Sequence, residues 1–389
     1  MSDEFELLII GGGPAGLSAA RAYRDAEGQG ALAIVTDEQR MPYNRPPLTK
    51  ELLRGEMSEA ELPIEDETWL AEQRVSLVSG RAVSLDPGRH AATLSGGRSL
   101  TYTSCVLATG AEPVRLPVPG ADDPAVRVLR SLDHLRELER RLDASGRVVV
   151  IGSGFIGCEI AASLRARGQD VTLISDEPAP NVARLGEGAA AEIARWLAQD
   201  GVQLRMGTEV HSIQRDGQTL HVVAGDLRAS APLVVMAAGV APRSELAAAA
   251  GLELEQGAVV TDAGMRTTTP DVLAAGDVCL AQNTAAGRRL RVEHWGDALG
   301  QGSVAGSTAA GVRAGWNDVP GFWSTIGSRT LKYAAWGDGY DQARMERGND
   351  GAFTVWYGGS GRVVGVLTHQ VDEDYERGRE LIAEGAPWS

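Results

Sequence analysis

Short apolar runs, each followed directly by a glycine-rich turn, organise the first half of the chain. Leu7–Ile10 leads into GGGPAG at 11–16, and the small apolar residues that follow continue as a helix. Val148–Ile151 leads into GSGFIG at 152–157 and repeats the arrangement. Each pattern predicts a buried strand, a tight turn and a helix whose N-terminus holds the pyrophosphate of a dinucleotide. Two such units in one chain predict two bound nucleotides.

A second apolar run follows each of these helices. In the first unit it spans Ala31–Val35, and Asp37 comes soon after it, at about the 20-residue offset expected for a carboxylate that binds an adenosine ribose. In the second unit the run spans Asp170–Ile174, and Ser175 and Asp176 follow it.

The rest of the pattern predicts strands with one helix at the end. Short alternating strands fill Val75–Tyr102, with turn signals at Asp86-Pro87-Gly88 and Ser95-Gly96-Gly97. From about Gly321, apolar runs predict strands at 331–336, 343–346, 353–357 and 363–368, and a helix from about Asp372 to Ala383.

Composition narrows the class of protein. A length of 389 residues suggests two or three domains, and an apolar fraction of 43% indicates a globular chain. The longest apolar runs fall short of the roughly 18 residues of a membrane span, and the first strand begins almost at Met1, so we expect a cytoplasmic protein without membrane association. A net charge of −15 argues against nucleic acid as a partner. Cys105, Cys158 and Cys279 are far apart, which excludes a local redox disulfide or zinc knuckle, and we expect no metal site.

The segment PYNRPPLTK at 42–50 resembles the PYxRPPLSK signature of FAD-dependent ferredoxin reductases, which serve Rieske dioxygenases and bacterial cytochrome monooxygenases. That family belongs to the glutathione-reductase-like flavoproteins. In disulfide-reducing members this region carries paired cysteines, and their absence here excludes a glutathione- or thioredoxin-reductase mechanism. The resemblance implies an α/β fold with two Rossmann-like dinucleotide-binding domains, one for FAD and one for NAD, and a small α+β C-terminal domain.

The resemblance also assigns residues to FAD. Lys50 is expected beside the flavin, where its charge steadies the reduced ring. A helix following the VEHW motif is expected to face the flavin pyrimidine with its N-terminus. The FAD-binding residues implied are Gly11, Gly13, Pro14, Ala15, Gly16, Asp37, Arg45, Lys50, Val83, Thr109, Gly110, Arg130, Gly276, Asp277, Glu293, His294 and Trp295.

The second glycine turn resembles the nicotinamide site. Glu159 is expected to meet Lys50 beside the flavin, so that these two residues are the catalytic pair. NADH-using relatives usually carry glutamate where this chain has Ser175, but no arginine here receives a 2′-phosphate, so we expect NADH over NADPH. The NADH-binding residues implied are Gly152, Gly154, Phe155, Ile156, Gly157, Glu159, Asp176 and Gly239.

The implied domains are an FAD-binding domain of residues 1–112 and 245–318, an NAD-binding domain of 113–244, and a dimerisation or docking domain of 319–389. The last begins with Phe322-Trp323-Ser324, which matches the first half of the family's FWSDQY, and Thr325-Ile326-Gly327 departs from the second half. We expect a monomer or homodimer.

The resemblance implies that hydride passes from NADH to flavin N5, and that single electrons then pass to an iron–sulfur ferredoxin feeding an oxygenase. Five cations, Arg288, Arg289, Arg291, Arg329 and Lys332, are a candidate docking face for that partner. Two alternatives remain open from the sequence: an NADH oxidase or a quinone or monodehydroascorbate-type reductase with a small-molecule acceptor, and an interaction protein like the apoptosis-inducing flavoprotein.

Overall fold

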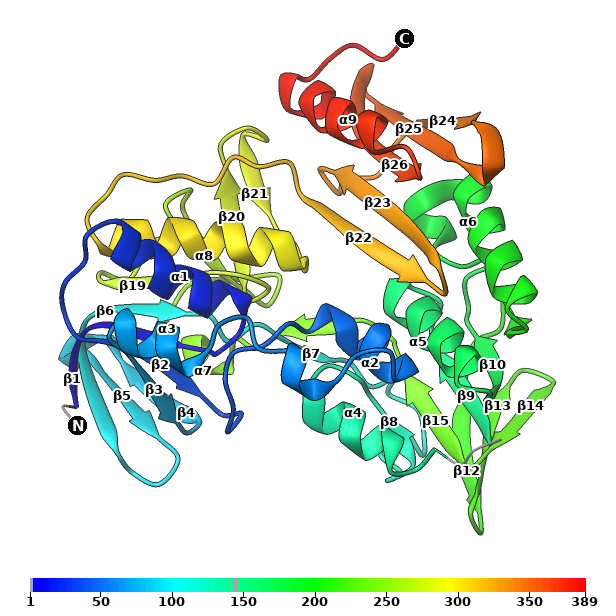
Figure 1. Cartoon of the computed structure of the whole chain (residues 1–389), viewed down its shortest axis with the longest axis horizontal. Coiled ribbons are helices and arrows are strands. Elements are labelled where there is room, and N and C mark those ends of the chain that lie inside the picture. The colour runs from blue at the N-terminus through cyan, green and yellow to red at the C-terminus, as the bar shows by residue number, and fades with distance from the viewer. Residues whose placement is uncertain (1–2, 143–145) are drawn as a thin grey trace.

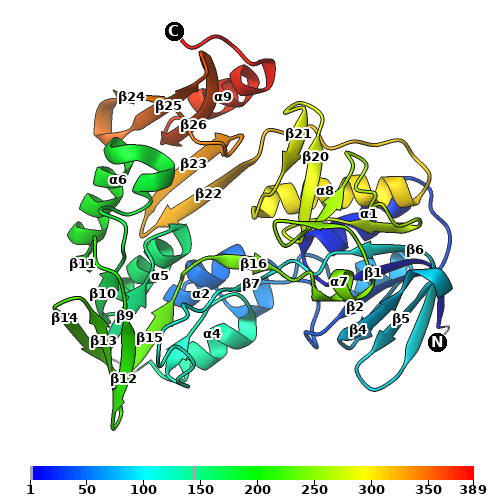
Figure 2. The same ribbon diagram turned by 180° about the vertical axis from the view of Figure 1, so that it is seen from behind.

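Two parallel sheets with the same strand order form the two lower lobes of the molecule (Figures 1 and 2). The structure is a computed structural model, and it describes residues 3–142 and 146–389; residues 1–2 and 143–145, within the expected FAD and NAD domains, lie outside the described part. The first sheet has the order β3-β2-β1-β6 with β19 beside β6, and the second has β11-β10-β9-β15 with β8 beside β15. The strands are β1 (Glu4–Ile10), β2 (Leu32–Thr36), β3 (Val75–Ser79), β6 (Ser99–Leu107), β19 (Val272–Ala274), β8 (Val126–Arg127), β9 (Arg147–Ile151), β10 (Asp170–Ile174), β11 (Gln203–Arg205) and β15 (Leu233–Met236).

The central strands are apolar throughout because both faces of each sheet are covered. In β1, Leu7, Leu8 and Ile9 are fully buried, and they lie between Leu32–Ile34 of β2 and Ser104–Val106 of β6. Two antiparallel strands, β5 (Ala91–Leu94) and β4 (Ala82–Asp86), extend the first sheet beyond β6.

Helix α1 (Pro14–Asp25) packs unusually close to α8 (Trp295–Ala309) on one face of the first sheet (Figure 1). A Cβ added at Gly302 would lie 2.2 Å from the Ala15 carbonyl oxygen, and one at Gly306 would lie 2.1 Å from that of Ala19. Glycine at these two positions therefore lets the backbones touch. This contact fixes the N-termini of both helices near the carboxyl end of β1.

A two-stranded antiparallel ribbon of β7 (Ala111–Pro113) and β16 (Val240–Pro242) connects the two lobes. The chain enters the second lobe through β7 and leaves through β16. The predicted boundaries after 112 and 244 lie at this ribbon, and the division into domains stays a prediction. Smaller sheets flank the lobes: β12 (Ser212–Asp216), β13 (Thr219–Ala224) and β14 (Leu227–Ala231) on one side, and β17 (Leu254–Glu255), β18 (Ala258–Thr261), β20 (Cys279–Asn283) and β21 (Arg288–Leu290) on the other.

The C-terminal part is a five-stranded antiparallel sheet covered by one helix, seen at the top of Figure 1. Four strands and the helix lie where the sequence pattern predicts them. The pattern missed the edge strand β22, which alternates a buried Ser324 with Trp323, 44% exposed. The elements are β22 (Gly321–Ile326), β23 (Arg329–Ala335), β24 (Gln342–Arg347), β25 (Phe353–Gly359), β26 (Arg362–His369) and α9 (Asp372–Glu384).

The remaining helices are short, apart from two in the second lobe. Over the described residues, none of the helices has the length and apolar character needed to cross a bilayer. These helices are α2 (Glu51–Arg54), α3 (Glu67–Glu72), α4 (Leu132–Glu139), α5 (Phe155–Ala166), α6 (Val182–Gln199) and α7 (Glu245–Ala249).

Candidate active site

The glycine turn between β1 and α1 leaves room for a phosphate at its centre. Gly11 has a φ of +129°, and a Cβ added there would lie 2.0 Å from the Ala108 carbonyl oxygen. A Cβ at Gly16 would lie 2.0 Å from the Gly11 oxygen, whereas one at Gly13 would meet nothing within 4 Å. The outer glycines therefore permit close packing, and the middle one faces open space. That space adjoins the free amides of the α1 N-terminus, which none of the described side chains caps.

The turn between β9 and α5 repeats this geometry. Gly152 has a φ of +102°, and a Cβ added there would lie 2.3 Å from the Ala237 oxygen. A Cβ at Gly157 would lie 2.0 Å from the Gly152 oxygen, and one at Gly154 would meet nothing within 4 Å. The molecule therefore has two cradles of the shape that holds a dinucleotide pyrophosphate.

The acidic residues after the second strand of each unit occupy equivalent places. The first glycine of each turn donates its N–H to the neighbouring strand, to the Val35 carbonyl in one unit and the Ile174 carbonyl in the other. Counted from these carbonyls, Asp37 corresponds to Asp176. Both carboxylates are accessible: the Asp37 side chain is 40% exposed and lies 3.8 Å from Arg243, and Asp176 is exposed.

Ser175 lies beneath this surface, and its hydroxyl donates to Asp176 Oδ1 at 3.4 Å. It is buried, its hydroxyl accepts a hydrogen bond from Ser153 Oγ at 2.9 Å, and it also accepts the Glu177 N–H. Thr36 accepts the Glu38 N–H in the same way in the first unit. The accessible carboxylate at the position equivalent to Asp37 is therefore that of Asp176, one residue beyond Ser175.

Lys50 and Glu159 form a buried ion pair where the segment that precedes α2 packs against α5. Lys50 Nζ lies 3.2 Å from Glu159 Oε2, and both side chains are less than a tenth exposed. Glu159 Oε2 also accepts the Thr49 hydroxyl at 2.5 Å, and Oε1 accepts the Ser324 hydroxyl at 2.8 Å. An ammonium has three N–H donors, and among the described residues Glu159 is its hydrogen-bond partner. Lys50 therefore keeps donors for a bound group.

Arg45 belongs to a second polar cluster beside the first cradle. Its Nη2 lies 2.6 Å from Glu38 Oε1, and its Nη1 donates to the Arg130 carbonyl at 3.0 Å. The Tyr43 hydroxyl donates to Glu38 Oε2 at 2.6 Å. Burial alone would raise the pKa of Glu38, but the Arg45 charge and the Tyr43 hydroxyl outweigh it and lower this pKa. Burial, reinforced by the Glu38 carboxylate, raises the pKa of Tyr43 to about 12.

Asp277 and Gln301 also lie beside the first cradle, and Arg130 links Asp277 to the Arg45 cluster. Asp277 Oδ2 lies 2.5 Å from Arg130 Nη2. The preceding Gly276 has a φ of +83° and donates its N–H to Gln301 Oε1 at 2.9 Å. Gln301 Nε2 is buried, and no described residue accepts from it. Because an unpaired buried donor is costly, this nitrogen marks a place for a ligand acceptor.

The N-terminus of α8 adds free amide groups near these residues. Trp295 is its first residue, and none of the described side chains caps the helix. His294 Nδ1 lies 3.0 Å from Asp297 Oδ2. Burial raises the pKa of Glu293, while nearby Arg291, 3.6 Å away, opposes the shift. A helix terminus of this kind favours an electron-rich or anionic group.

Taken together, these groups fit FAD in the first unit and NADH in the second. Asp277 and the unpaired Gln301 amide lie beside the first cradle, which suits a cofactor that stays bound. The second opens beside Ile156, which is 46% exposed. The individual ligand roles assigned from the sequence stay predictions.

Four further predicted ligands lie on β4 or near the ribbon that connects the lobes. Val83, on β4, is 54% exposed. Thr109 donates its hydroxyl to the Arg243 carbonyl at 2.7 Å near the connecting ribbon, where Gly110 and Gly239 take φ values of +69° and +98°. Thr109, Gly110 and Gly239 therefore adjoin the ribbon of β7 and β16.

Sequence reasoning missed four residues that hold the site together: Thr49, Ser324, Glu38 and Gln301. Thr49 precedes Lys50 within the quoted signature, so its position was a usable signal. Ser324 lies 165 residues from Glu159, and no spacing rule joins them.

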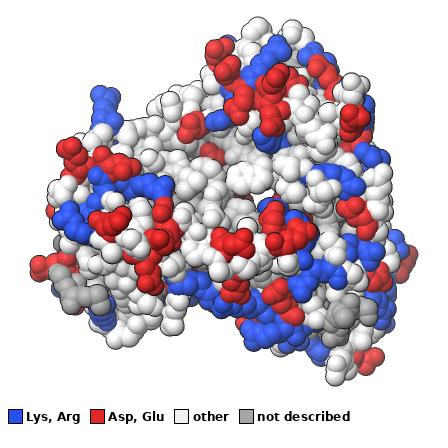
Figure 3. Space-filling model, viewed as in Figure 1, with Lys and Arg blue, Asp and Glu red and all other residues white. Residues whose placement is uncertain are grey.

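The five cations predicted as a docking face divide into two groups, each neutralised locally. Three lie on or just after β21 and two on β23. In Figure 3, basic and acidic side chains are intermixed around a mainly uncharged central hollow. The pairs are Arg288–Asp338, Arg289–Glu255, Arg291–Glu293, Arg329–Asp200 and Lys332–Asp372.

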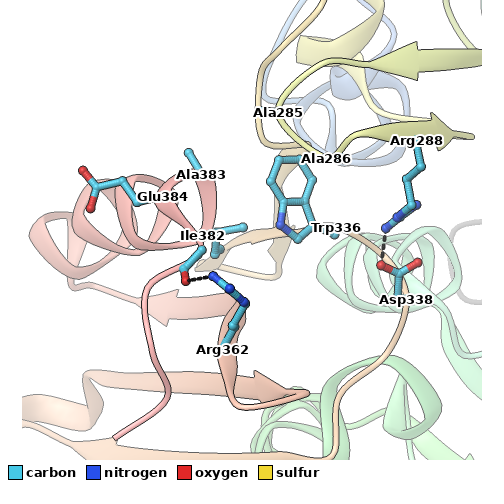
Figure 4. A pocket seen from close by; sticks show the side chains of 10 residues that line it. Ala285, Ala286, Arg288, Trp336, Asp338, Arg362, Ile382, Ala383 and Glu384 are labelled. Carbon is cyan, nitrogen blue, oxygen red and sulfur yellow. Dashed lines mark hydrogen bonds and ion pairs between the residues drawn. The ribbon is translucent and has the colours of Figure 1, made fainter.

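A cavity of about 290 Å³ lies between β21 and the C-terminal sheet. Trp336 projects into it, and its cations are engaged: Arg288 pairs with Asp338, and Arg362 donates to the Gly385 carbonyl at 2.6 Å (Figure 4). It lies apart from both cradles, and its lining offers little unpaired charge to a ligand.

The cysteines take no part in the site. Cys105, Cys158 and Cys279 are buried and unpaired, and burial raises the pKa of each thiol well above its usual range. Within 3–142 and 146–389, no three His, Cys, Asp or Glu side chains are grouped so that they could hold a metal ion.

Comparisons with known proteins agree with this geometry. Residues 5–302 match the model of the family described as "Pyridine nucleotide-disulphide oxidoreductase". The chain is 34% identical over 331 residues to rubredoxin-NAD(+) reductase from Pseudomonas putida, covering 84% of this chain and 85% of that one. It is 33% identical to the ferredoxin–NAD(+) reductase component of the anthranilate 1,2-dioxygenase system from Burkholderia cepacia, covering 97% and 94%.

A solved structure matches over the whole chain. The ferredoxin reductase for the CYP199A2 system from Rhodopseudomonas palustris superposes with a TM-score of 0.94 at 30% identity, covering 100% of this chain and 96% of that one. This likeness confirms the predicted α/β fold class.

Proposed function

This chain belongs to the pyridine nucleotide-disulphide oxidoreductase family, and from that membership we propose that it is an NADH-dependent, FAD-containing ferredoxin reductase. The observation that carries the proposal is the buried Lys50–Glu159 pair, whose carboxylate lies on the helix that follows the second of two phosphate cradles. When bound, FAD supplies a ring that accepts a hydride and releases its two electrons singly to a one-electron acceptor.

The chain's own residues bind and orient the two nucleotides. The amides around Gly13 and Gly154 bind the two pyrophosphates, because these positions leave space and lie at uncapped helix N-termini. Lys50 presents a positive charge in a buried place, where water screens it little. The free amides at the N-terminus of α8 would stabilise negative charge on a bound flavin.

The residues that follow β10 favour NADH over NADPH. The exposed position of Asp176 supports a role as the ribose carboxylate, and a negative charge there would repel a 2′-phosphate. Because Ser175 is hydrogen-bonded to Ser153, the serine at this position does not displace the Asp176 carboxylate.

The acceptor is an iron–sulfur ferredoxin, as the names of the relatives suggest. Because the five candidate cations are each paired with a carboxylate, docking depends more on shape and uncharged surface than on a basic patch. We place the protein in the cytoplasm as a monomer or homodimer, and the three unpaired cysteines suit a reducing compartment.

A test of the acceptor compares turnover with and without a ferredoxin. The purified yellow protein is given NADH and cytochrome c, and we expect cytochrome c reduction to require added ferredoxin. Equally fast turnover with oxygen or a quinone alone would favour the small-molecule reductase. Very slow turnover with NADH-dependent dimerisation would favour an interaction protein.

A further inference from the structure

Side chains from three separate parts of the chain meet at Glu159. Thr49 and Lys50 come from the loop before α2, Glu159 itself comes from α5 in the second lobe, and Ser324 comes from β22 of the C-terminal sheet. All four residues are buried. We propose that Thr49 and Ser324 are positioning residues that fix the Glu159 carboxylate, and through it the Lys50 ammonium, beside the flavin. This inference rests on the proposed function.

The two carboxylate oxygens have different partners. Ser324 Oγ donates to Oε1 at 2.8 Å, while Thr49 Oγ1 and Lys50 Nζ share Oε2. Among the described residues, Ser324 is the donor to Oε1. Without it a buried, ionised oxygen loses its partner, and the carboxylate is free to rotate about its last bond.

Two side chains on one face of α5 form hydrogen bonds with Thr49. Its hydroxyl donates to Glu159, and its carbonyl accepts Ser163 Oγ at 2.7 Å. Glu159 and Ser163 are four residues apart, so they lie one above the other on the helix. These two hydrogen bonds hold the backbone that leads into Lys50, and they therefore limit where the Lys50 ammonium can lie.

Two side chains of β22 contact two residues of α5 that are spaced one helical turn apart. Phe322 and Ser324 point to the same face of β22, because alternate residues share a face. Phe322 packs edge-to-face on Phe155 at a ring separation of 4.6 Å, and Ser324 bonds Glu159, one helical turn further along. Two contacts at this spacing fix the sheet against the helix, so the position of Ser324 relative to Glu159 is well defined.

The experiment compares Ser324→Ala with a matched loss of a hydroxyl elsewhere. Thr354 Oγ1, on β25 of the same sheet, donates to Asp374 Oδ2 of α9 at 2.5 Å, and Thr354→Ala removes the hydroxyl of an equally buried side chain away from the Lys50–Glu159 pair. Flavin reduction by excess NADH is followed anaerobically by stopped flow, and the NADH dissociation constant is measured in the same series.

We expect Ser324→Ala to slow flavin reduction about tenfold with little change in NADH affinity, since a hydrogen bond to a charged group is lost. Thr354→Ala should reduce at the wild-type rate. Ser324→Thr and Thr49→Ser, which keep a hydroxyl, should retain most of the rate, whereas Thr49→Ala should lose it. Equal rates for Ser324→Ala and Thr354→Ala would overturn the proposal.

A second readout needs no flavin. In the FAD-free protein, Ser324→Ala should lower the unfolding temperature, and the same change should cost much less once Glu159 is replaced by Gln. Additive effects of the two changes would show that Ser324 does not act through Glu159. If the wild-type protein takes up FAD but NADH does not reduce it, the proposed function fails, and this cycle still tests the contact.

Discussion

The two nucleotide units share a turn but differ in what surrounds it. In both, the first and third glycines pack against backbone oxygens, and the middle glycine faces open space. Around the first turn, residues from other segments form ion pairs, among them Arg45 with Glu38 and Arg130 with Asp277. The glycine turn identifies a phosphate site in both units. The ion pairs around the first turn distinguish the site of a permanently bound cofactor from the site of a nucleotide that exchanges with solution.

The largest expected effects come from filling each cradle in turn. Gly13 and Gly154 have extended backbones, with φ of −89° and −66°, so valine is accommodated without strain. We expect Gly13→Val to be purified without FAD. Gly154→Val should keep FAD but need roughly a hundredfold more NADH, as a loss of about 3 kcal/mol of binding would produce.

The measurements are the visible spectrum of each purified variant and the NADH concentration for half-maximal reduction. Gly88→Val, on an exposed turn, is the control and should behave as wild type. If Gly154→Val lost FAD and Gly13→Val kept it, the assignment of the two units would be reversed.

The next largest effect concerns the residues that join the two units. Lys50→Met should keep FAD but slow its reduction by NADH about tenfold to a hundredfold, because a buried positive charge near the developing negative charge is lost. Stopped-flow reduction and the FAD content of the variant are measured together. A variant with full FAD and an unchanged rate would remove Lys50 from the catalytic pair.

A smaller effect should separate the two ribose carboxylates. Asp176→Asn should raise the KM for NADH about fivefold to tenfold, since one charge-assisted hydrogen bond is weakened, and should bring the kcat/KM for NADPH closer to that for NADH. Asp37→Asn should weaken FAD retention and leave the KM for NADH unchanged. If Asp176→Asn left the preference for NADH unaltered, the correspondence of Asp176 with Asp37 would carry no functional meaning.

The smallest effect is a pH-dependent difference in stability. Because the pKa of Glu38 is lowered in the folded protein, its ion pair stabilises the fold above the carboxyl's ordinary pKa, and this contribution is lost as pH falls through the lowered value. Glu38→Gln should therefore cost about 1–3 kcal/mol at pH 7 and much less under acidic conditions.

The equivalent change in the second unit is the control. The Glu177 carboxylate accepts the Ala183 N–H at 3.4 Å, and no described arginine pairs with it. Glu177→Gln should therefore change the unfolding temperature little at either pH. Thermal unfolding of the FAD-free variants at both pH values measures the difference, and a pH-independent loss in Glu38→Gln would rule out this ion pair as the cause.

The sequence predicted the two nucleotide units because their signals are local. An apolar run of four residues and three glycines at fixed spacing specify the strand, the turn and the helix together. The edge strand β22 was missed because Gly321–Ile326 lacks a simple apolar–polar alternation and becomes a strand by pairing with β23. Its role becomes apparent only from the hydrogen bond between Ser324 and Glu159, which are 165 residues apart in the sequence.

Electrostatic surroundings were the least predictable from sequence. The cations Arg288 and Lys332 carry no local sign that Asp338 and Asp372 neutralise them, since these partners lie 40 or more residues away along the chain. The Lys50–Glu159 meeting was expected from the family resemblance alone, because no physical rule relates residues 109 positions apart.

The most direct test of the account is an anaerobic titration of the purified, FAD-loaded protein with NADH, followed by its visible absorbance. We predict that the yellow colour is lost in proportion to the NADH added until each FAD has received one equivalent, and that NADPH does this far less effectively. A protein whose bound flavin keeps its colour in excess NADH would contradict the claim that the two cradles deliver the nicotinamide to FAD.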